Sequence, residues 1–337
     1  MYRYGGSAYG AVTSLFPFSV GEYMLIAGTL WVILALGMLV VLGTGRLFKR
    51  FRPVPVSIKR FFCVTGLVFS AVLLIMTINC YTLYNASGLT GEDREYETDS
   101  MRALRNEVVE KACTLSGEVG RDSSGRATFQ ANGLDLQSAG EEARKCISSL
   151  SGDYPELSGF VVRPKPMMFS DLMSQSYMQG YYFPFSMEAN VNVRMQDTHI
   201  PFTMCHELSH TKGFISEDDA NFLGFLACAR SEDTYFRYCA YLGVLYYVDN
   251  EYRRGELCRD SDPVITETVK NDAMFLTEEA WQQVEENAVV DTETVHKASD
   301  AFVEGNLKAN GVSQGMKIYS EVVKRLLYYR EKNGNLP

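Results

Sequence analysis

Two long apolar runs near the N-terminus are the strongest hydrophobic pattern in the chain. Residues 23–45 and residues 61–91 contain no charged side chain. Each run is long enough to cross a hydrocarbon layer of about 30 Å at about 1.5 Å per residue. We therefore predict that residues 1–85 form a membrane anchor, with transmembrane helices over about 23–43 and 61–83.

The connector between the two runs is strongly basic and sets the predicted orientation. It contains no acidic residue and six basic ones: Arg46, Lys49, Arg50, Arg52, Lys59 and Arg60. The positive-inside rule places this connector in the cytoplasm, so both termini and everything after about residue 84 are predicted to be extracytoplasmic. The chain carries a net charge of −9 and the connector contributes six positive charges, so residues 84–337 carry −15. The lipid bilayer is thus an expected partner, whereas the acidic remainder argues against nucleic acid or anionic lipid.

Helical periodicity dominates residues 86–337, which we predict to form one extracytoplasmic domain. Apolar residues recur at spacings of three and four over 99–119, and residues 136–150 show a second helical pattern. The chain after residue 230 is helical in pattern throughout. About 250 residues are enough to bury a substantial core. The predicted fold class is α+β, mainly α.

Two extended segments interrupt the helical pattern. Residues 159–163 predict a strand, which Pro164 and Pro166 restrict to the edge or end of a sheet. Residues 187–193 alternate apolar and polar side chains, the period-two pattern of a half-buried strand. A small sheet is therefore expected just before residue 200.

The candidate chemistry begins with the sequence HELSH at residues 206–210, in a chain with only four histidines. On a helix, positions i and i+4 share one face, so His206 and His210 can bind one tetrahedral Zn²⁺. Glu207 can then accept a proton from a water that the metal activates. The alternative is a helix with two partly exposed histidines that bind nothing.

A catalytic zinc needs a third protein ligand, and the next segment offers one. Gly213 can end the first helix, and Ser216 with Asp219 resembles a capping box that opens a second helix. Glu217 then lies in the first turn of that helix and is the candidate third ligand. Asn221 lies one turn further on and is the candidate residue that orients a ligand histidine.

The run from Glu217 to Asn221 resembles the Glu-x-x-Ala-Asp element of gluzincin peptidases. That resemblance implies that the Glu is the third ligand and that the last residue lies behind a ligand histidine. Asn replaces Asp here, which weakens polarisation of the histidine without removing a ligand. The metzincin pattern fits worse, because its third ligand falls on Ser216, a poor zinc ligand. His199 is an alternative ligand or substrate contact.

A longer set of motifs resembles one bacterial family. The motifs are Pro164-Lys165-Pro166, Tyr182-Phe183-Pro184-Phe185 with Glu188 to Asn192, Pro201-Phe202-Thr203, HELSH, Phe236-Arg237-Tyr238, and Leu307 to Gly311. Together they resemble the domain-of-unknown-function 3810 family of membrane proteins, which carry a zinc-peptidase-like motif. The resemblance covers roughly residues 20–330. It implies two transmembrane helices followed by a zincin-like metallopeptidase domain with a small sheet and a helical C-terminal part, and it implies no substrate.

The resemblance also suggests where a substrate would bind. In zinc peptidases, an edge strand above the metal pairs with an extended substrate backbone. Residues 185–193 are therefore the candidate substrate strand, with Glu188, Asn190 and Asn192 as possible contacts. The alternative is an ordinary sheet strand with a polar outer face. Tyr238 is the candidate oxyanion stabiliser, although a tyrosine stripe such as the one around it is more often core.

The cysteines give no metal pattern. Six of the eight lie outside the apolar runs, and their spacing fits no CxxC zinc site. Cys113 and Cys146, on adjacent predicted helices, are the first pair to test for a disulfide. The alternative is that most of the cysteines are small buried hydrophobic residues.

Three functions are compatible with these observations. The first is a membrane-bound zinc metallopeptidase acting on a peptide or protein, with His206, His210 and Glu217 as ligands and Glu207 as the general base. The second is a non-catalytic receptor or scaffold that keeps the metal site. The third is a zinc hydrolase acting on a cell-wall or other non-peptide bond. A free sheet edge in the metal cleft would favour an extended peptide, whereas a covered edge would favour the scaffold. The sequence leaves the oligomeric state open.

Overall fold

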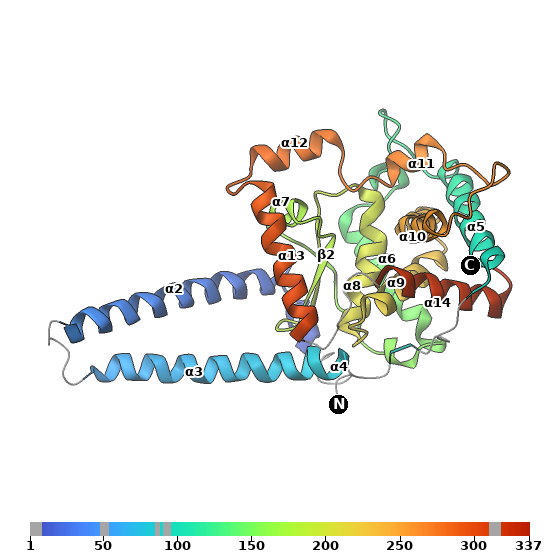
Figure 1. Ribbon diagram of the computed structural model, residues 1–337. Helices are drawn as coiled ribbons and strands as arrows, with labels where there is room; N and C mark the ends of the chain where they lie inside the picture. Colours follow the sequence, from blue (N-terminus) through green and yellow to red (C-terminus); the bar gives the residue numbers. More distant parts are fainter. Residues whose placement is uncertain (1–8, 48–53, 85–87, 90–95, 310–317) are drawn as a thin grey trace.

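The computed structural model describes residues 9–47, 54–84, 88–89, 96–309 and 318–337. Three basic residues of the predicted connector lie outside this part of the chain: Lys49, Arg50 and Arg52. So do Asn310 and Gly311 of the last motif. The described part is mainly helical with one small sheet (Figure 1), which agrees with the predicted class.

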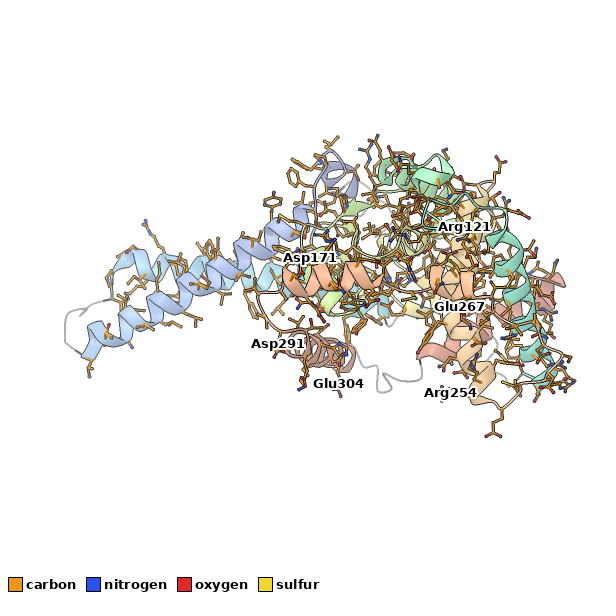
Figure 2. All side chains as sticks on the ribbon, turned by 90° about the horizontal axis from the view of Figure 1, so that it is seen from above. Arg121, Asp171, Arg254, Glu267, Asp291 and Glu304 are labelled. Carbon is orange, nitrogen blue, oxygen red and sulfur yellow. The ribbon has the colours of Figure 1, made fainter. Side chains whose placement is uncertain are left out.

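Two long helices project together from one side of the folded part (Figures 1 and 2). The first is α2, Val20–Leu47. The second is a continuous helical run, Val56–Tyr84, made of α3 (Val56–Met76), the π-helical turn η1 (Thr77–Tyr81) and α4 (Thr82–Tyr84). Their most apolar stretches have mean hydropathies of 2.6 and 2.5 and are not covered by the rest of the protein. Both helices are therefore long and apolar enough to cross a membrane, as predicted.

Helices also build the core of the folded part. The predicted helices over 99–119 and 136–150 are confirmed as α5 (Thr98–Ser116) and α6 (Leu136–Ser149). A capping box between Asp135 and Ser138 opens α6. The remaining helices are α7 (Ser170–Gln175), α8 (Ile200–Thr211), α9 (Glu217–Ala229), α10 (Thr234–Arg254), α11 (Glu267–Asp272), α12 (Glu278–Glu286), α13 (Thr292–Ala309) and α14 (Ile318–Asn333).

The sheet has three short strands in the order β1-β3-β2. They are β1 (Lys165–Pro166), β2 (Gly180–Phe183) and β3 (Glu188–Val191), with β3 parallel to β1 and antiparallel to β2. The predicted strand over 159–163 is wrong, because these residues do not pair with another strand. Of residues 159–166, only Lys165 and Pro166, the two residues of β1, pair with β3. β1 does lie at an edge of the sheet, where a proline nitrogen needs no partner.

The candidate substrate strand 185–193 is also wrong, because β3 is the central strand and is paired on both sides. Its polar side chains are buried rather than presented to a substrate. The Asn190 amide donates to the Tyr181 carbonyl at 3.1 Å, and the Asn192 amide donates to Ser174 Oγ at 2.9 Å. These side chains therefore fasten the sheet to its surroundings.

Glu188 holds the first apolar helix on the sheet. Its carboxylate pairs with Lys165 Nζ, and both side chains are 1% exposed. The same carboxylate accepts hydrogen bonds from the Val20 and Gly21 N–H groups at 3.1 and 2.8 Å. These N–H groups open α2, where unpaired donors and the helix dipole favour an anion. Glu188 is thus a structural anchor point and not a substrate contact.

Further contacts tie both apolar helices to the folded part. The Glu22 carboxylate accepts from the Met168 and Phe169 N–H groups at 2.9 Å each. On the second helix, the Asn79 amide donates to the Pro184 carbonyl at 2.9 Å. The Val20 end of α2 and the Tyr84 end of the second helical run are therefore docked beside the sheet. We call these the outer ends of the two helices.

Cys113 and Cys146, the first pair to test for a disulfide, both have free thiols. Cys113 lies 3.9 Å from the Val264 carbonyl oxygen, whereas Cys146 is buried on α6. The sulfur atoms of Cys205 and Cys228 lie 3.4 Å apart between α8 and α9, and both residues are fully buried. The buried cysteines thus behave as small core residues.

We expect Glu188→Ala to lower the free energy of unfolding by about 3–5 kcal/mol, because Lys165 would stay buried without a counter-charge. Chemical unfolding of the full-length protein in detergent micelles measures this effect. The matched control is Glu141→Ala, which removes a carboxylate that is 38% exposed and pairs with Arg144 and Arg163. The control should change the free energy of unfolding by less than about 1 kcal/mol. Equal effects of the two variants would contradict the structural role of Glu188.

Candidate metal centre

The HELSH segment lies on one continuous helix, α8. A short 3₁₀ turn, Asp197–His199, precedes α8, and Pro201 lies in its first turn. No side-chain hydrogen bond caps the start of α8, since Thr198 Oγ1 donates to the Asp272 carbonyl and Asp197 accepts the Phe129 N–H. Just beyond α8, Gly213 takes a left-handed conformation with φ of 99°, so the chain turns back there.

Helix α9 begins with Glu217, and its first turn is fixed by the C-terminal helix. Ser216 occupies the N-cap position, but its side chain makes no capping hydrogen bond. Asp219 instead pairs with Arg325 of α14 at 2.6 Å and accepts the Leu89 N–H at 3.2 Å. The predicted capping box is therefore replaced by a buried ion pair.

Helices α8 and α9 pack unusually closely. A Cβ atom added at Gly224 would lie 3.2 Å from the backbone nitrogen of His206. Further along, Cys228 Sγ donates to the Pro201 carbonyl at 3.5 Å. Gly224 lies seven residues after Glu217, which is about two helical turns, so both face α8. This packing turns Glu217 toward the two histidines.

Three side chains form a group that could hold a metal ion: His206, His210 and Glu217. The two Nε2 atoms are 3.0 Å apart. Glu217 Oε2 lies 3.2 Å from His206 Nε2, and its Oε1 lies 3.6 Å from His210 Nε2. Both histidines are largely buried, whereas the Glu217 side chain is 46% exposed. All three predicted ligands therefore meet at one point that remains open to solvent.

The other ring nitrogens show how the histidines are held. Nδ1 of His210 lies 2.7 Å from the Phe214 carbonyl oxygen. A carbonyl can only accept, so Nδ1 carries a proton and Nε2 of the neutral ring keeps its lone pair toward the group. His206 Nδ1 is buried without a hydrogen-bond partner among the described residues. Asn221 lines the same cavity, but among these residues no hydrogen bond links it to either imidazole, so the Phe214 carbonyl orients His210 instead.

Glu207 is buried beside the sheet, with 4% of its surface exposed. Its Oε2 has no hydrogen-bond partner in the described part of the chain. A Cβ atom added at Gly180, the first residue of β2, would lie 2.7 Å from Glu207 Cγ and 2.7 Å from Thr203 Cγ2. Only glycine leaves room for the carboxylate here. A glycine at the start of an aromatic strand is the one weak sign in the sequence that Gly180 makes room for another group.

The charges of the group are strongly coupled. Burial raises the pKa of Glu207 to about 7, although the two histidines oppose the shift. Burial favours a lower pKa for His210, but the Glu217 carboxylate outweighs it and raises that pKa to about 9. Burial opposes ionisation of Glu217 as well, yet the histidines hold its pKa well below the usual range. A bound cation would add its own charge and favour the unprotonated form of each group.

The group opens into a cavity of about 1530 Å³. Strand β2 and the loop after it, residues 180–185, line one side of the cavity. Helix α13 contributes Ala301 and Gly305, and Figure 1 shows α13 passing beside β2. The adjoining α12 is fastened to α7, because Asn287 donates to Asp171 at 3.2 Å (Figure 2).

Comparison with known proteins gives one match. A family model described as "Protein of unknown function (DUF3810)" matches residues 1–328. The chain belongs to the DUF3810 family. No curated protein and no solved structure matches it. The family match confirms the resemblance seen in the motifs, while the chemistry of the site has to be argued from its geometry.

Two other predicted residues of this DUF3810 protein lie away from the metal group. Tyr238 is fully buried, and its hydroxyl donates to Asp272 Oδ2 at 2.6 Å, so the oxyanion prediction is wrong. Burial and that carboxylate raise the pKa of Tyr238 far above its usual value. His199 does line the cavity, but its Nε2 lies 3.0 Å from the Met274 carbonyl oxygen. Tyr182 lies nearer to the metal group than Tyr238 does: its ring centroid is 6.1 Å from that of His210.

In the metal-free protein we expect Glu207→Gln to raise the free energy of unfolding at pH 8 by up to about 3 kcal/mol. Burial raises the pKa of Glu207 from its usual 4.5 to about 7, so the ionised form is penalised. The stability that protonated Glu207 contributes is complete below pH 4.5 and is lost as the pH rises through about 7. Denaturation in the presence of a chelator, repeated across this pH range, measures the difference. A difference that does not change with pH would contradict the assignment.

Proposed function

We propose that this protein is a membrane-anchored zinc peptidase. The observation that carries the proposal is the spacing of the candidate ligand groups: the two histidine Nε2 atoms are 3.0 Å apart, and each lies 3.2 or 3.6 Å from one of the two Glu217 carboxylate oxygens. Two zinc–nitrogen bonds of about 2.05 Å at a tetrahedral angle place their nitrogens about 3.3 Å apart. Two histidines and one glutamate also form the donor set of catalytic zinc sites, which keep a position open. The exposed side of Glu217 leaves that position accessible from the cavity.

Zinc, when bound by His206, His210 and Glu217, supplies Lewis acidity that lowers the pKa of water and polarises a peptide carbonyl. Glu207 is the general base in this proposal. Its partnerless Oε2 is free to accept a proton from the attacking water and to pass it to the departing amine. The Phe214 carbonyl fixes the ring of His210 so that Nε2 faces the metal.

Strand β2 takes the role of the substrate strand. Its inner side pairs with β3, and the Asn192 N–H donates to the Gln179 carbonyl at 2.8 Å. Hydrogen-bonded pairs alternate along an antiparallel ladder, so Gly180 directs its N–H and C=O groups away from β3, toward the outer edge of β2. That edge lines the cavity beside Glu207. An extended peptide can add there as a further strand, which favours a peptide substrate over a scaffold.

The membrane placement completes the proposal. Helix α2 and the run Val56–Tyr84 cross the bilayer, and the basic connector between them lies in the cytoplasm. The peptidase domain, residues 86–337, and both termini are then extracytoplasmic. The docked outer ends of the two helices hold the domain at the membrane surface.

Glu207→Gln should abolish peptide cleavage while the purified protein keeps one zinc per chain, because the base is not a ligand. His206→Ala should lose the zinc. Elemental analysis of the full-length protein in detergent, with a peptide library as substrate, measures both outcomes. Glu141→Gln is the surface control and should cleave as the wild type does. Stoichiometric zinc without cleavage of any peptide by the wild type would instead favour the scaffold.

Gly180→Ala should lower cleavage by roughly 100-fold with zinc content unchanged, because the new methyl group displaces the Glu207 side chain. The atoms that it would meet are Glu207 Cγ and Thr203 Cγ2, each at 2.7 Å. The control is Gly152→Ala, since a Cβ atom there meets nothing within 4 Å. If the Gly180→Ala variant cleaved at the wild-type rate, the position of Glu207 would not limit the reaction.

A further inference from the structure

The cavity that holds the metal group also reaches the two apolar helices. Leu25 of α2, Met76 of α3 and Cys80 of η1 line it together with His206, Glu207 and His210. The lining is therefore ionisable at the metal group and apolar where the two helices contribute, and we call the part lined by Leu25 and Met76 the apolar end. Phe183 and Phe185 add further apolar side chains to the lining.

The apolar end lies below the outer ends of the helices. Helix α2 has 28 residues and the second run has 29, so each is about 43 Å long, close to a bilayer with its headgroups. Met76 lies eight residues before Tyr84, or about 12 Å along the axis, and Leu25 lies about 7 Å from Val20. The headgroup layer is about 6 Å thick, so both side chains lie at the level of the acyl chains.

The described contacts between the two helices lie deeper than this end of the cavity. Trp31 stacks on Phe61 and donates to Thr65 Oγ1 at 3.1 Å. Nearer to the folded part, the helices are held by the sheet, through Glu188 at Gly21 and through Asn79 at the Pro184 carbonyl. The sheet thus keeps the outer ends in place on either side of the apolar end of the cavity. A rigid mount of this kind fixes the height of the metal group above the bilayer.

We infer that the substrate is a polypeptide anchored in the same bilayer and cleaved within a few residues of its membrane-embedded apolar group. That group occupies the end of the cavity lined by Leu25 and Met76, and the adjoining backbone extends along β2 to the metal. This inference rests on the proposed peptidase function and names its substrate class. A lipid chain and a transmembrane segment share the required chemistry.

Full-length protein in vesicles of phosphatidylethanolamine and phosphatidylglycerol allows a direct test. The probe is a fluorogenic peptide that the wild type cleaves, prepared free, palmitoylated through a spacer of about four residues, and palmitoylated through about forty Gly/Ser residues that reach about 35 Å. Both anchored forms are concentrated on the membrane alike. We expect the short form to be cleaved about tenfold faster than the long form at equal surface density. Equal rates, or a faster long form, would overturn the inference and leave the peptidase function standing.

A second arm separates the two kinds of anchor. The palmitoyl chain is replaced by a transmembrane segment of leucine and alanine with the same short spacer. Preference for one of the two short forms assigns the source of the apolar group. Cleavage of neither, with the free peptide still cleaved, would overturn the inference.

Leu25→Trp and Met76→Trp narrow the apolar end of the cavity. Each should lower the ratio of anchored to free peptide cleavage by roughly fivefold. The matched controls are Leu30→Trp and Leu74→Trp, exposed positions of the same helices that do not line the cavity, and they should leave the ratio unchanged. Unchanged ratios in all four variants would contradict the proposed path.

A binding measurement keeps the inference testable if no peptide is cleaved. The Glu207→Gln variant is irradiated with a palmitoylated peptide that carries a benzophenone next to the lipid, and the attachment site is mapped. Attachment around Leu25 and Met76 would support the proposed path of the anchored polypeptide, independently of the test of cleavage. Attachment spread evenly over the lipid-facing surface would overturn the inference.

Discussion

The distance between helices α8 and α9 is the constraint on which the metal group depends. At Gly224 a side chain would push the two helices apart by a few tenths of an ångström, since an added Cβ atom would lie 3.2 Å from the His206 nitrogen. One candidate ligand atom from each of the three residues lies within 4.8 Å of the other two, so a widening of the gap would separate Glu217 from the histidines. Arg325 of α14 holds the first turn of α9 from the other side. The C-terminal helix therefore supports the site although it contributes no ligand.

Two buried glutamates beside the sheet show how surroundings decide a role. The Glu188 carboxylate pairs with Lys165 and accepts hydrogen bonds from two backbone N–H groups, so its role is to hold the structure together. Glu207 keeps one oxygen without a partner, and burial raises its pKa to about 7. A carboxylate in that state can exchange a proton near neutral pH. The two acids are chemically identical in the sequence, and only their neighbours distinguish them.

Sequence reasoning succeeded where a local pattern is sufficient. The apolar runs, the helices around residues 99–150 and the i, i+4 histidines each depend on neighbours a few positions away. It failed where the outcome depends on distant partners. An alternating pattern over 187–193 predicts a strand with two different faces, but it does not predict whether the strand lies at the centre or the edge of the sheet. β3 is central because it pairs with both β1 and β2. Gly180 and Gly224 matter through the side chain that they lack, and one sequence gives almost no signal for that.

The hydrogen bonds between Glu188 and the start of α2 can form only late in the synthesis of the chain. Val20 and Glu188 are 168 residues apart, so at ordinary translation speeds α2 emerges roughly 10 to 30 s before its partner exists. The N–H groups at the start of α2 are therefore satisfied by water during that interval. Once the sheets of two neighbouring chains have formed, each sheet offers the same site to either copy of α2. Exchange of this first helix between neighbouring copies is the assembly error to which this architecture is most open.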